Sequence, residues 1–235
     1  MCYVYFCALC LWFLFMLLNG KDRYEWCVAD GYYPQARMSE TGKVKCLTWN
    51  CRGMGNLKNI RQVMDRIKQS QAKVVFLQET HMMTENTVKI KRRWQGQVFS
   101  GCYASNARGV MILIHKSIPI QVEKITKDPA GRFVIVQGVL FSEKINLINV
   151  YGPNDDNPNF FNDLFLTISS LSGLYIMAGD MNCTLDPVKD RSTGSDSSHV
   201  KTRKVIQQFM KDLNLLDIWR HLNPTSTAYS CYSST

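Results

Sequence analysis

The chain has 235 residues, 46% of them hydrophobic, so it can bury a full core as one large domain or as two small ones. Lysine and arginine outnumber aspartate and glutamate by 28 to 19, and the formal net charge of +9 favours polyanionic partners, nucleic acid before anionic membrane. The 9 cysteines lack paired metal-ligand spacing, which excludes a zinc framework and fits a reducing intracellular compartment. The basic run 89–93 is either a phosphate-contacting patch or a solvated face.

The N-terminal segment differs from the rest of the chain. Residues 2–18 form an uncharged apolar run of about the minimum length of a transmembrane helix, but no basic region precedes it as in a secretory signal. From Met38 onward the sequence resembles an ordinary cytosolic start. We therefore expect residues 1–42 to be an extension outside the fold, with membrane anchor and signal peptide as alternatives, and residues 43–235 to form the domain. The expected location is nuclear or cytoplasmic, or membrane-anchored if residues 2–18 insert.

From Lys43 onward, strand-like and helix-like segments alternate. Short apolar runs predict strands at residues 45–49, 74–78, 109–115, 133–141, 145–150 and 174–178. Apolar residues at helical spacing predict helices at residues 57–67, 160–171 and 205–213. The turn at 127–131 predicts antiparallel neighbours in the middle of the chain, and the polar stretch 190–199 predicts a loop. Mixed strands with outer helices indicate two sheets packed together and covered by helices.

Polar side chains follow four of these predicted strands at their carboxyl ends. They are Asn50, Glu79, Tyr151 and the pair Asp180 and Asn182. Residues two apart, such as Asp180 and Asn182, lie on one face of a strand. Ligands of α/β proteins bind outside the carboxyl ends of strands, so we expect these five side chains to share one site.

The residue types in this set are typical of phosphodiester hydrolysis. Glu79 and the amide oxygen of Asn50 are hard ligands for one Mg²⁺ that keeps most of its waters. Asp180 can position or deprotonate an attacking water, while Asn182, Asn50 and the Tyr151 hydroxyl can donate hydrogen bonds to phosphoryl oxygens. Each of these residue types, taken alone, is also common in ordinary turns, so the prediction depends on their joint occurrence.

Five motifs stand together in a characteristic order, at residues 48–53, 77–81, 149–154, 179–182 and 216–220. In this order they resemble the endonuclease/exonuclease/phosphatase superfamily, and most of all the endonuclease domain of long interspersed element (non-LTR) retrotransposon polyproteins. The resemblance implies an α/β four-layer sandwich of two mixed β-sheets flanked by helices. It also implies nicking of DNA that depends on Mg²⁺, with Mn²⁺ as the alternative ion, and no small-molecule cofactor.

The resemblance also implies a role for each site residue. Catalysis falls to Asp180, Asn182, Tyr151 and Asn50, metal binding to Glu79 and Asn50, and contact with the scissile phosphate to Ser230. The family pattern continues with a second acidic residue and a terminal Ser-Asp-His, neither of which precedes Thr235. We therefore expect a domain without its last strands and with weak or absent nicking. His81 is expected to have a structural role beside Glu79.

Two alternative functions remain open from the sequence. Another phosphodiesterase of the superfamily, an abasic-site nuclease or a lipid or inositol phosphatase, uses similar chemistry. A non-catalytic remnant would instead bind DNA through charge alone, or a membrane through residues 2–18.

Overall fold

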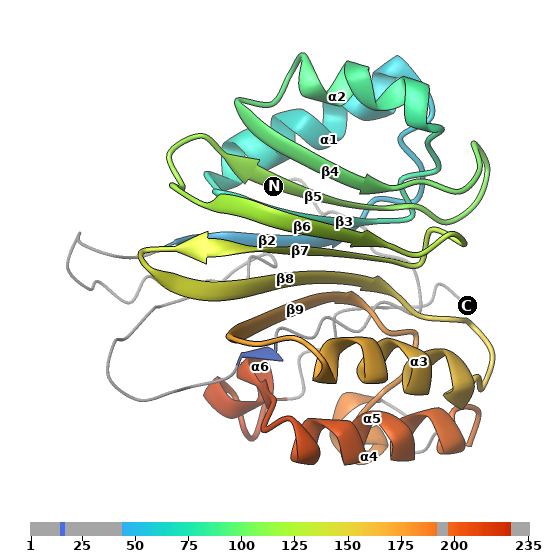
Figure 1. Cartoon of the computed structure of the whole chain (residues 1–235). Coiled ribbons are helices and arrows are strands. Elements are labelled where there is room, and N and C mark those ends of the chain that lie inside the picture. The colour runs from blue at the N-terminus through green and yellow to red at the C-terminus, as the bar shows by residue number, and fades with distance from the viewer. Residues whose placement is uncertain (1–14, 17–43, 192–196, 227–235) are drawn as a thin grey trace.

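The structure is a computed structural model that describes residues 15–16, 44–191 and 197–226. Two β-sheets lie face to face, with helices on the outer side of each, so the chain forms the predicted four-layer α/β sandwich (Figure 1). Ser230, most of the apolar run 2–18 and the centre of the predicted loop 190–199 lie outside the described residues. Within the described part of the chain, no helix is long and apolar enough to cross a membrane.

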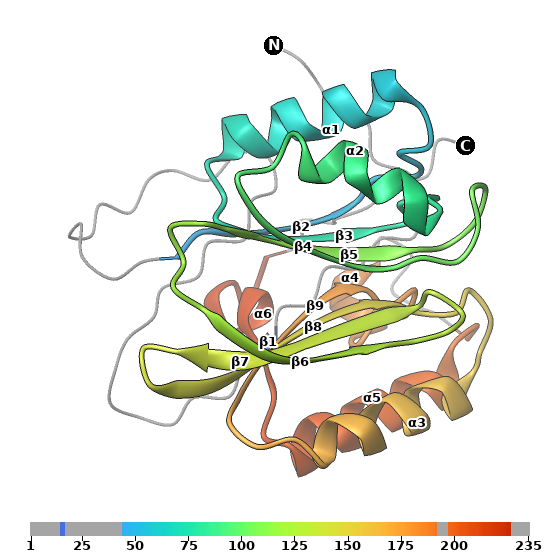
Figure 2. The same cartoon turned by 45° about the horizontal axis from the view of Figure 1, so that its top comes forward.

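The first sheet has four strands in the order β2-β3-β5-β4. Its strands are β2 (Cys46–Asn50), β3 (Val74–Gln78), β4 (Gly96–Gly101) and β5 (Val110–His115). β2 and β3 are parallel, and β5 is antiparallel to both β3 and β4. Its outer face is covered by α1 (Leu57–Ser70), the 3₁₀ turn η1 (Thr84–Thr87) and α2 (Val88–Lys91) (Figure 2).

The second sheet has six strands in the order β10-β1-β9-β8-β7-β6. Its strands are β1 (Phe15–Met16), β6 (Gln121–Lys127), β7 (Phe133–Leu140), β8 (Glu143–Tyr151), β9 (Leu174–Asp180) and β10 (Leu216–Asp217). β8 and β9 are parallel, whereas the other pairs are antiparallel. The helices on this side are α3 (Pro158–Ser169), α4 (Pro187–Asp190), α5 (Val200–Asp212) and α6 (Ile218–Leu222).

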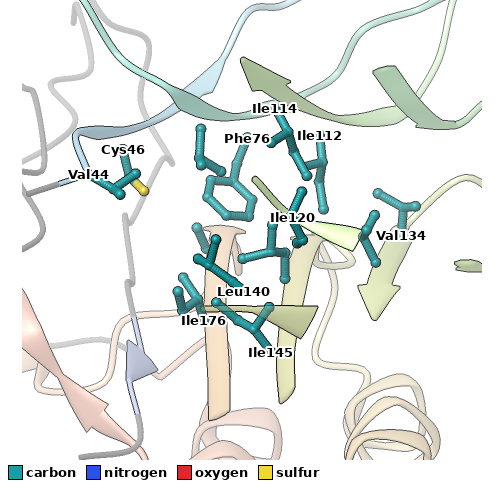
Figure 3. Close-up of a cluster of buried hydrophobic side chains, with 14 of the residues drawn as sticks. Val44, Cys46, Phe76, Ile112, Ile114, Ile120, Val134, Leu140, Ile145 and Ile176 are labelled. Atoms are coloured by element: carbon teal, nitrogen blue, oxygen red, sulfur yellow. The ribbon is translucent and has the colours of Figure 1, made fainter. Parts of the chain in front are cut away.

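Alternation along the central strands builds three apolar layers. On β3, Val74 and Phe76 face the second sheet, while Val75 and Leu77 face α1. β9 is arranged in the same way between the first sheet and α3. Because both faces are buried, these strands read in sequence as continuous apolar runs, which is why they are predictable. The core between the two sheets, shown in Figure 3, contains side chains from both.

The middle of the chain differs from the sequence prediction in one respect. The segments 109–115 and 133–141 belong to different sheets, because β6 lies between them and pairs with β7. The antiparallel arrangement is confirmed, but β4 and β6 were not predicted. Both are edge strands without a long apolar run, since β6 is mostly exposed and the only large apolar residues of β4 are Val98 and Phe99.

Candidate active site

The inner faces of four strands change from apolar to polar toward the same edge of the sandwich. The series, by strand, are Cys46, Thr48 and Asn50 on β2; Phe76 and Gln78 on β3; Leu147, Asn149 and Tyr151 on β8; and Ile176, Ala178 and Asp180 on β9. Since β2 runs parallel to β3 and β8 parallel to β9, each pair delivers its carboxyl ends together. The sequence therefore places polar groups of both sheets at one edge.

Asn50 joins the two sheets at this edge. Its Nδ2 donates one hydrogen bond of 2.8 Å to Oε1 of Glu79 and another of 2.8 Å to Oδ2 of Asp180. Asn50 is 5% exposed and Asp180 is 2% exposed, so the bond between them is shielded from solvent, whereas the bond to Glu79 is partly buried. Two carboxylates from different sheets thus meet on one amide group.

Glu79 reaches this point through an unusual backbone conformation. By strict alternation it would follow Leu77 toward α1. Its φ of 50° instead lies in the left-handed region, and its carboxylate contacts Asn50. His81 and Asn182 also have positive φ, at 48° and 51°. Such residues concentrate where the surrounding structure holds a strained backbone for function, which supports an active site here.

The turn after β8 connects Tyr151 with Asn182. Nδ2 of Asn182 donates to Oδ1 of Asn154 at 2.8 Å and to the Gly152 carbonyl at 2.9 Å. The Tyr151 hydroxyl donates to the same Oδ1 of Asn154 at 3.4 Å. Both amide hydrogens of Asn182 are therefore used within the protein, so the predicted donation to a phosphoryl oxygen requires one bond to break. The exposed Asn154 has its oxygen engaged, which makes its amide nitrogen the group to offer a ligand.

The site is electrostatically negative around Tyr151. Burial raises the pKa of the Tyr151 hydroxyl well above its ordinary value, and the nearby carboxylates of Glu79 and Asp180 raise it further. The hydroxyl is therefore a neutral hydrogen-bond donor across the physiological range. On the neighbouring surface, the guanidinium of Arg132 lies 5.7 Å from the centre of the Tyr151 ring.

The donor set at this edge fits a divalent cation with oxygen ligands. Glu79 and Asp180 present carboxylates to a single amide group, and a Mg²⁺ ion is commonly held by one or two carboxylates plus waters and phosphate. The predicted ligand atom of Asn50 is turned away, since its Oδ1 accepts the Arg52 backbone N–H at 3.1 Å. Asn50 would have to rotate its amide to bind metal, so a carboxylate is the better ligand, and Glu79 is the more exposed of the two. Among the described residues, no cluster of three or more His, Cys, Asp or Glu side chains forms a metal site by itself.

The structure brings together all the predicted site residues that it describes: Asn50, Glu79, Tyr151, Asp180 and Asn182. Ser230 lies outside the described residues. Nε2 of His81 is 3.5 Å from Oε2 of Glu79, in keeping with its expected place.

The prediction missed three polar residues of this region, namely Asn154, Gln78 and Asn149. Asn154 follows Tyr151 by three positions in the motif at residues 149–154, so its place at the site could have been predicted. Gln78 and Asn149 interrupt apolar strands at inner-face positions, and this interruption is the signal that could have revealed them.

Comparison with known proteins defines the class to which this fold and site belong. Residues 47–235 match the endonuclease/exonuclease/phosphatase family, and the chain belongs to that family.

Two solved AP endonuclease structures share the fold. The AP endonuclease from Archaeoglobus fulgidus is 17% identical, with a TM-score of 0.64 over 79% of this chain and 77% of that one. AP endonuclease LMAP from Leishmania major is 18% identical, with a TM-score of 0.61 over 76% of this chain and 69% of that one. At these identities the likeness shows the fold alone.

Proposed function

We propose that this protein is a Mg²⁺-dependent phosphodiesterase that nicks DNA, of the kind found in non-LTR retrotransposons. The observation that carries the proposal is the meeting of Glu79 and Asp180, from different sheets, on the amide of Asn50. Membership of the endonuclease/exonuclease/phosphatase family supports it.

Asp180 is the group best placed to orient and deprotonate an attacking water. Its Oδ2 accepts a hydrogen bond from Asn50, and its Oδ1 accepts the Asn182 backbone N–H at 3.0 Å. These bonds fix the orientation of the carboxylate, as a group that positions a water requires. A Mg²⁺ ion held by Glu79 would, when bound, supply positive charge against the phosphoryl oxygens.

Neutral donors complete the site on the side of the second sheet. The Tyr151 hydroxyl stays protonated, so it can donate to a phosphoryl oxygen as negative charge develops there. The amide nitrogen of Asn154 can donate beside it, because the Asn154 oxygen is held by Asn182. Asn182 thereby positions Asn154 and Asp180.

A nucleic-acid substrate fits the cationic and aromatic groups beside the site. The Arg108 guanidinium stacks 4.6 Å from the centre of the exposed Tyr103 ring. Burial, followed by the charge of Arg108, lowers the pKa of Arg132. The Gly109 N–H donates to the Gly131 carbonyl at 3.1 Å, which brings the backbones of Arg108 and Arg132 close together. The backbone of Arg108 pairs with His81, and that of Arg132 pairs with Tyr151, which places both at the active edge. Arginine and aromatic groups together suit phosphates and unstacked bases.

Conversion of supercoiled plasmid to open circles tests the proposed function. The protein is used in excess over DNA so that slow cleavage is detected, with Mg²⁺ and with EDTA. We expect Mg²⁺-dependent nicking that is lost in Asp180→Ala. Nicking that persists equally in Asp180→Ala or in EDTA would refute the proposal.

A substrate panel separates the alternatives. An intact duplex, a duplex with one abasic site and an inositol polyphosphate are compared at equal concentrations. Preference for intact duplex supports the retrotransposon-type activity. Cleavage confined to the abasic site supports a repair nuclease, and release of phosphate from the inositol compound supports a phosphatase.

A further inference from the structure

A buried amide network crosses from one sheet to the other directly behind the active edge. Asn149 of β8 donates from Nδ2 to the carbonyl oxygens of Leu77 at 2.9 Å and Met111 at 2.8 Å. Gln78 of β3 donates from Nε2 to Oδ1 of Asn149 at 2.7 Å and to Oγ1 of Thr48 at 3.2 Å. Gln78 and Asn149 are both 0% exposed.

The direction of each bond in this network follows from its chemistry. Backbone carbonyls only accept, so Asn149 must turn its amino group toward Leu77 and Met111. These two residues are register partners on β3 and β5, which lets one amide reach both carbonyls. The oxygen of Asn149 then faces Gln78, and Gln78 must present its amino group. These bonds together tie β8 of one sheet to β2, β3 and β5 of the other.

The residues of the network come one or two positions before the site residues in the sequence. Thr48 precedes Asn50 by two positions, and Asn149 precedes Tyr151 by two. Gln78 directly precedes Glu79. A shift of one sheet against the other would therefore move Glu79 away from Asp180, since these residues belong to different sheets.

These buried polar side chains do not give the most stable packing between the two sheets. Of the residues that the structure describes, Gln78 and Thr80 each have a buried oxygen without a hydrogen-bond partner, and Glu79 lies between them with a positive φ. Buried acceptors without partners destabilise a fold, and apolar side chains of similar volume are often no worse for stability than buried polar pairs. The placement of the polar residues points to a role beyond stability.

We propose that Asn149 and Gln78 are positioning residues that hold the two sheets in register at the active edge, so that Glu79 and Asp180 meet on Asn50. The chemical consequence rests on the proposed function. The geometric consequence does not, because it concerns only the hydrogen bonds of Asn50 to Glu79 and Asp180.

The chain offers a closely matched control in Asn146, on the same strand. Asn146 is 1% exposed, and its Nδ2 also donates to two backbone carbonyls, those of Ser172 at 2.9 Å and Leu174 at 3.2 Å. Leu174 is in β9, next to β8, so the bonds of Asn146 stay on its own side of the sandwich. Both Asn146→Leu and Asn149→Leu remove two donations to backbone carbonyls. Asn149→Leu also removes the bond accepted from Gln78, and only it breaks the connection between the sheets.

The test compares the full-length wild type with these two variants after ¹⁵N labelling of asparagine. The first readout is hydrogen exchange of the Asn50 side-chain amide, with its signal assigned through Asn50→Asp. We expect similar losses of melting temperature in both variants, and exchange at Asn50 that is about tenfold faster only in Asn149→Leu. Thr48→Val, a milder change, keeps the test available if Asn149→Leu does not fold, and it should shift Asn50 exchange in the same direction.

The second readout is Mg²⁺ affinity, measured by titration calorimetry. We expect about 10- to 100-fold weaker binding in Asn149→Leu and little change in Asn146→Leu. Equal Asn50 exchange in the two variants, or an unprotected Asn50 amide in the wild type, would overturn the inference. A wild type that neither binds Mg²⁺ nor nicks DNA would refute the proposed function, while the exchange comparison would still decide the positioning role.

Discussion

At the scale of single residues, Glu79 and Asp180 share Asn50 but differ in what surrounds them. Glu79 is 22% exposed on its side chain and lies beside His81, whereas Asp180 is almost fully buried and accepts the Asn182 backbone N–H. The more open carboxylate is suited to a metal that exchanges with solvent. The buried one is suited to holding a water against the phosphorus.

This difference predicts distinct responses to Mg²⁺. Glu79→Gln should raise the Mg²⁺ concentration needed for nicking by about 10- to 100-fold, and high Mg²⁺ should partly restore the rate. Asp180→Ala should lower the rate by about 10²- to 10⁴-fold at every Mg²⁺ concentration, because general-base assistance is lost. The measurement is single-turnover nicking across a Mg²⁺ titration. Superimposable titrations for the two variants would show that the roles are misassigned.

Tyr151 provides a prediction about pH. Burial and the carboxylates of Glu79 and Asp180 keep the pKa of Tyr151 high, so the hydroxyl does not ionise up to about pH 9.5. Tyr151→Phe should therefore lower the nicking rate by about 10- to 100-fold without changing the shape of the pH–rate profile between about pH 6 and 9.5. An alkaline decline that is present in the wild type and absent from Tyr151→Phe would contradict this assignment.

At the scale of elements, α6 begins with a carboxylate in an unfavourable environment. Asp217 caps the helix by accepting the Arg220 backbone N–H at 2.9 Å. Burial raises the pKa of Asp217 from 3.8 to about 6; the Arg220 bond opposes this, and Asp190 adds to it. In folded protein the carboxyl holds a proton at pH values where the unfolded chain has lost it. The contribution to stability is thus fully present below about pH 4 and is lost as pH rises through about 6.

Asp217→Asn should remove this pH dependence while keeping the cap, since asparagine caps helices equally well. The free energy of unfolding should rise by about 1–2 kcal/mol at pH 7.5 and change little at pH 4.5. Denaturant unfolding at the two pH values measures it. Asp186→Asn, in the cap of α4 with a side chain 44% exposed, is the control and should have a small effect at both. Equal effects of the two substitutions would refute the assignment to burial.

Another element contact connects α5 to the turn that carries Asn154. Asp156 accepts the backbone N–H groups of Thr202 at 2.7 Å and Lys201 at 3.2 Å, in the first turn of α5. Burial opposes ionisation of Asp156, but the hydrogen bonds from Thr202 and Lys201 outweigh it and lower the pKa. His199, 7% exposed, lies with Nε2 2.9 Å from the Asn154 carbonyl. The start of α5 is thus connected to this turn by two contacts, one through Asp156 and one through His199.

At the scale of the whole molecule, the formal charge of +9 predicts DNA binding that weakens steeply with salt. If Arg108 and Arg132 contact phosphates, Arg108→Ala and Arg132→Ala should each reduce the slope of log affinity against log salt by about 1. Fluorescence anisotropy with a duplex of arbitrary sequence measures this. Lys204→Ala, at an exposed position on α5, is the control with an expected change near zero. Equal reductions for all three variants would indicate that the net charge attracts DNA and that the DNA follows no defined path on the protein.

How well the sequence predicts each element of this molecule depends on how deeply that element is buried. Central strands such as β3 and β9 were found because both their faces are apolar, and the edge strands β4 and β6 were missed because theirs are not. The site residues were found because polar groups at strand ends must lie at one edge. The direction of the Asn50 amide was not predictable, because it depends on the Arg52 backbone N–H and on a carboxylate that lies 130 positions away.

The division of the site between the sheets has a consequence for engineering. Apart from β1, the first sheet uses residues 46–115 and the second uses residues 121–217, and the chain crosses between them once, through the exposed Lys116 and Ser117. A cut between these two residues leaves the first sheet whole and removes only β1 from the second, but it separates Glu79 from Asp180. The two fragments should be inert alone and regain Mg²⁺-dependent nicking when tethered partner proteins bring them together, as a split reporter does. Nicking by either fragment alone would show that the site does not need both sheets.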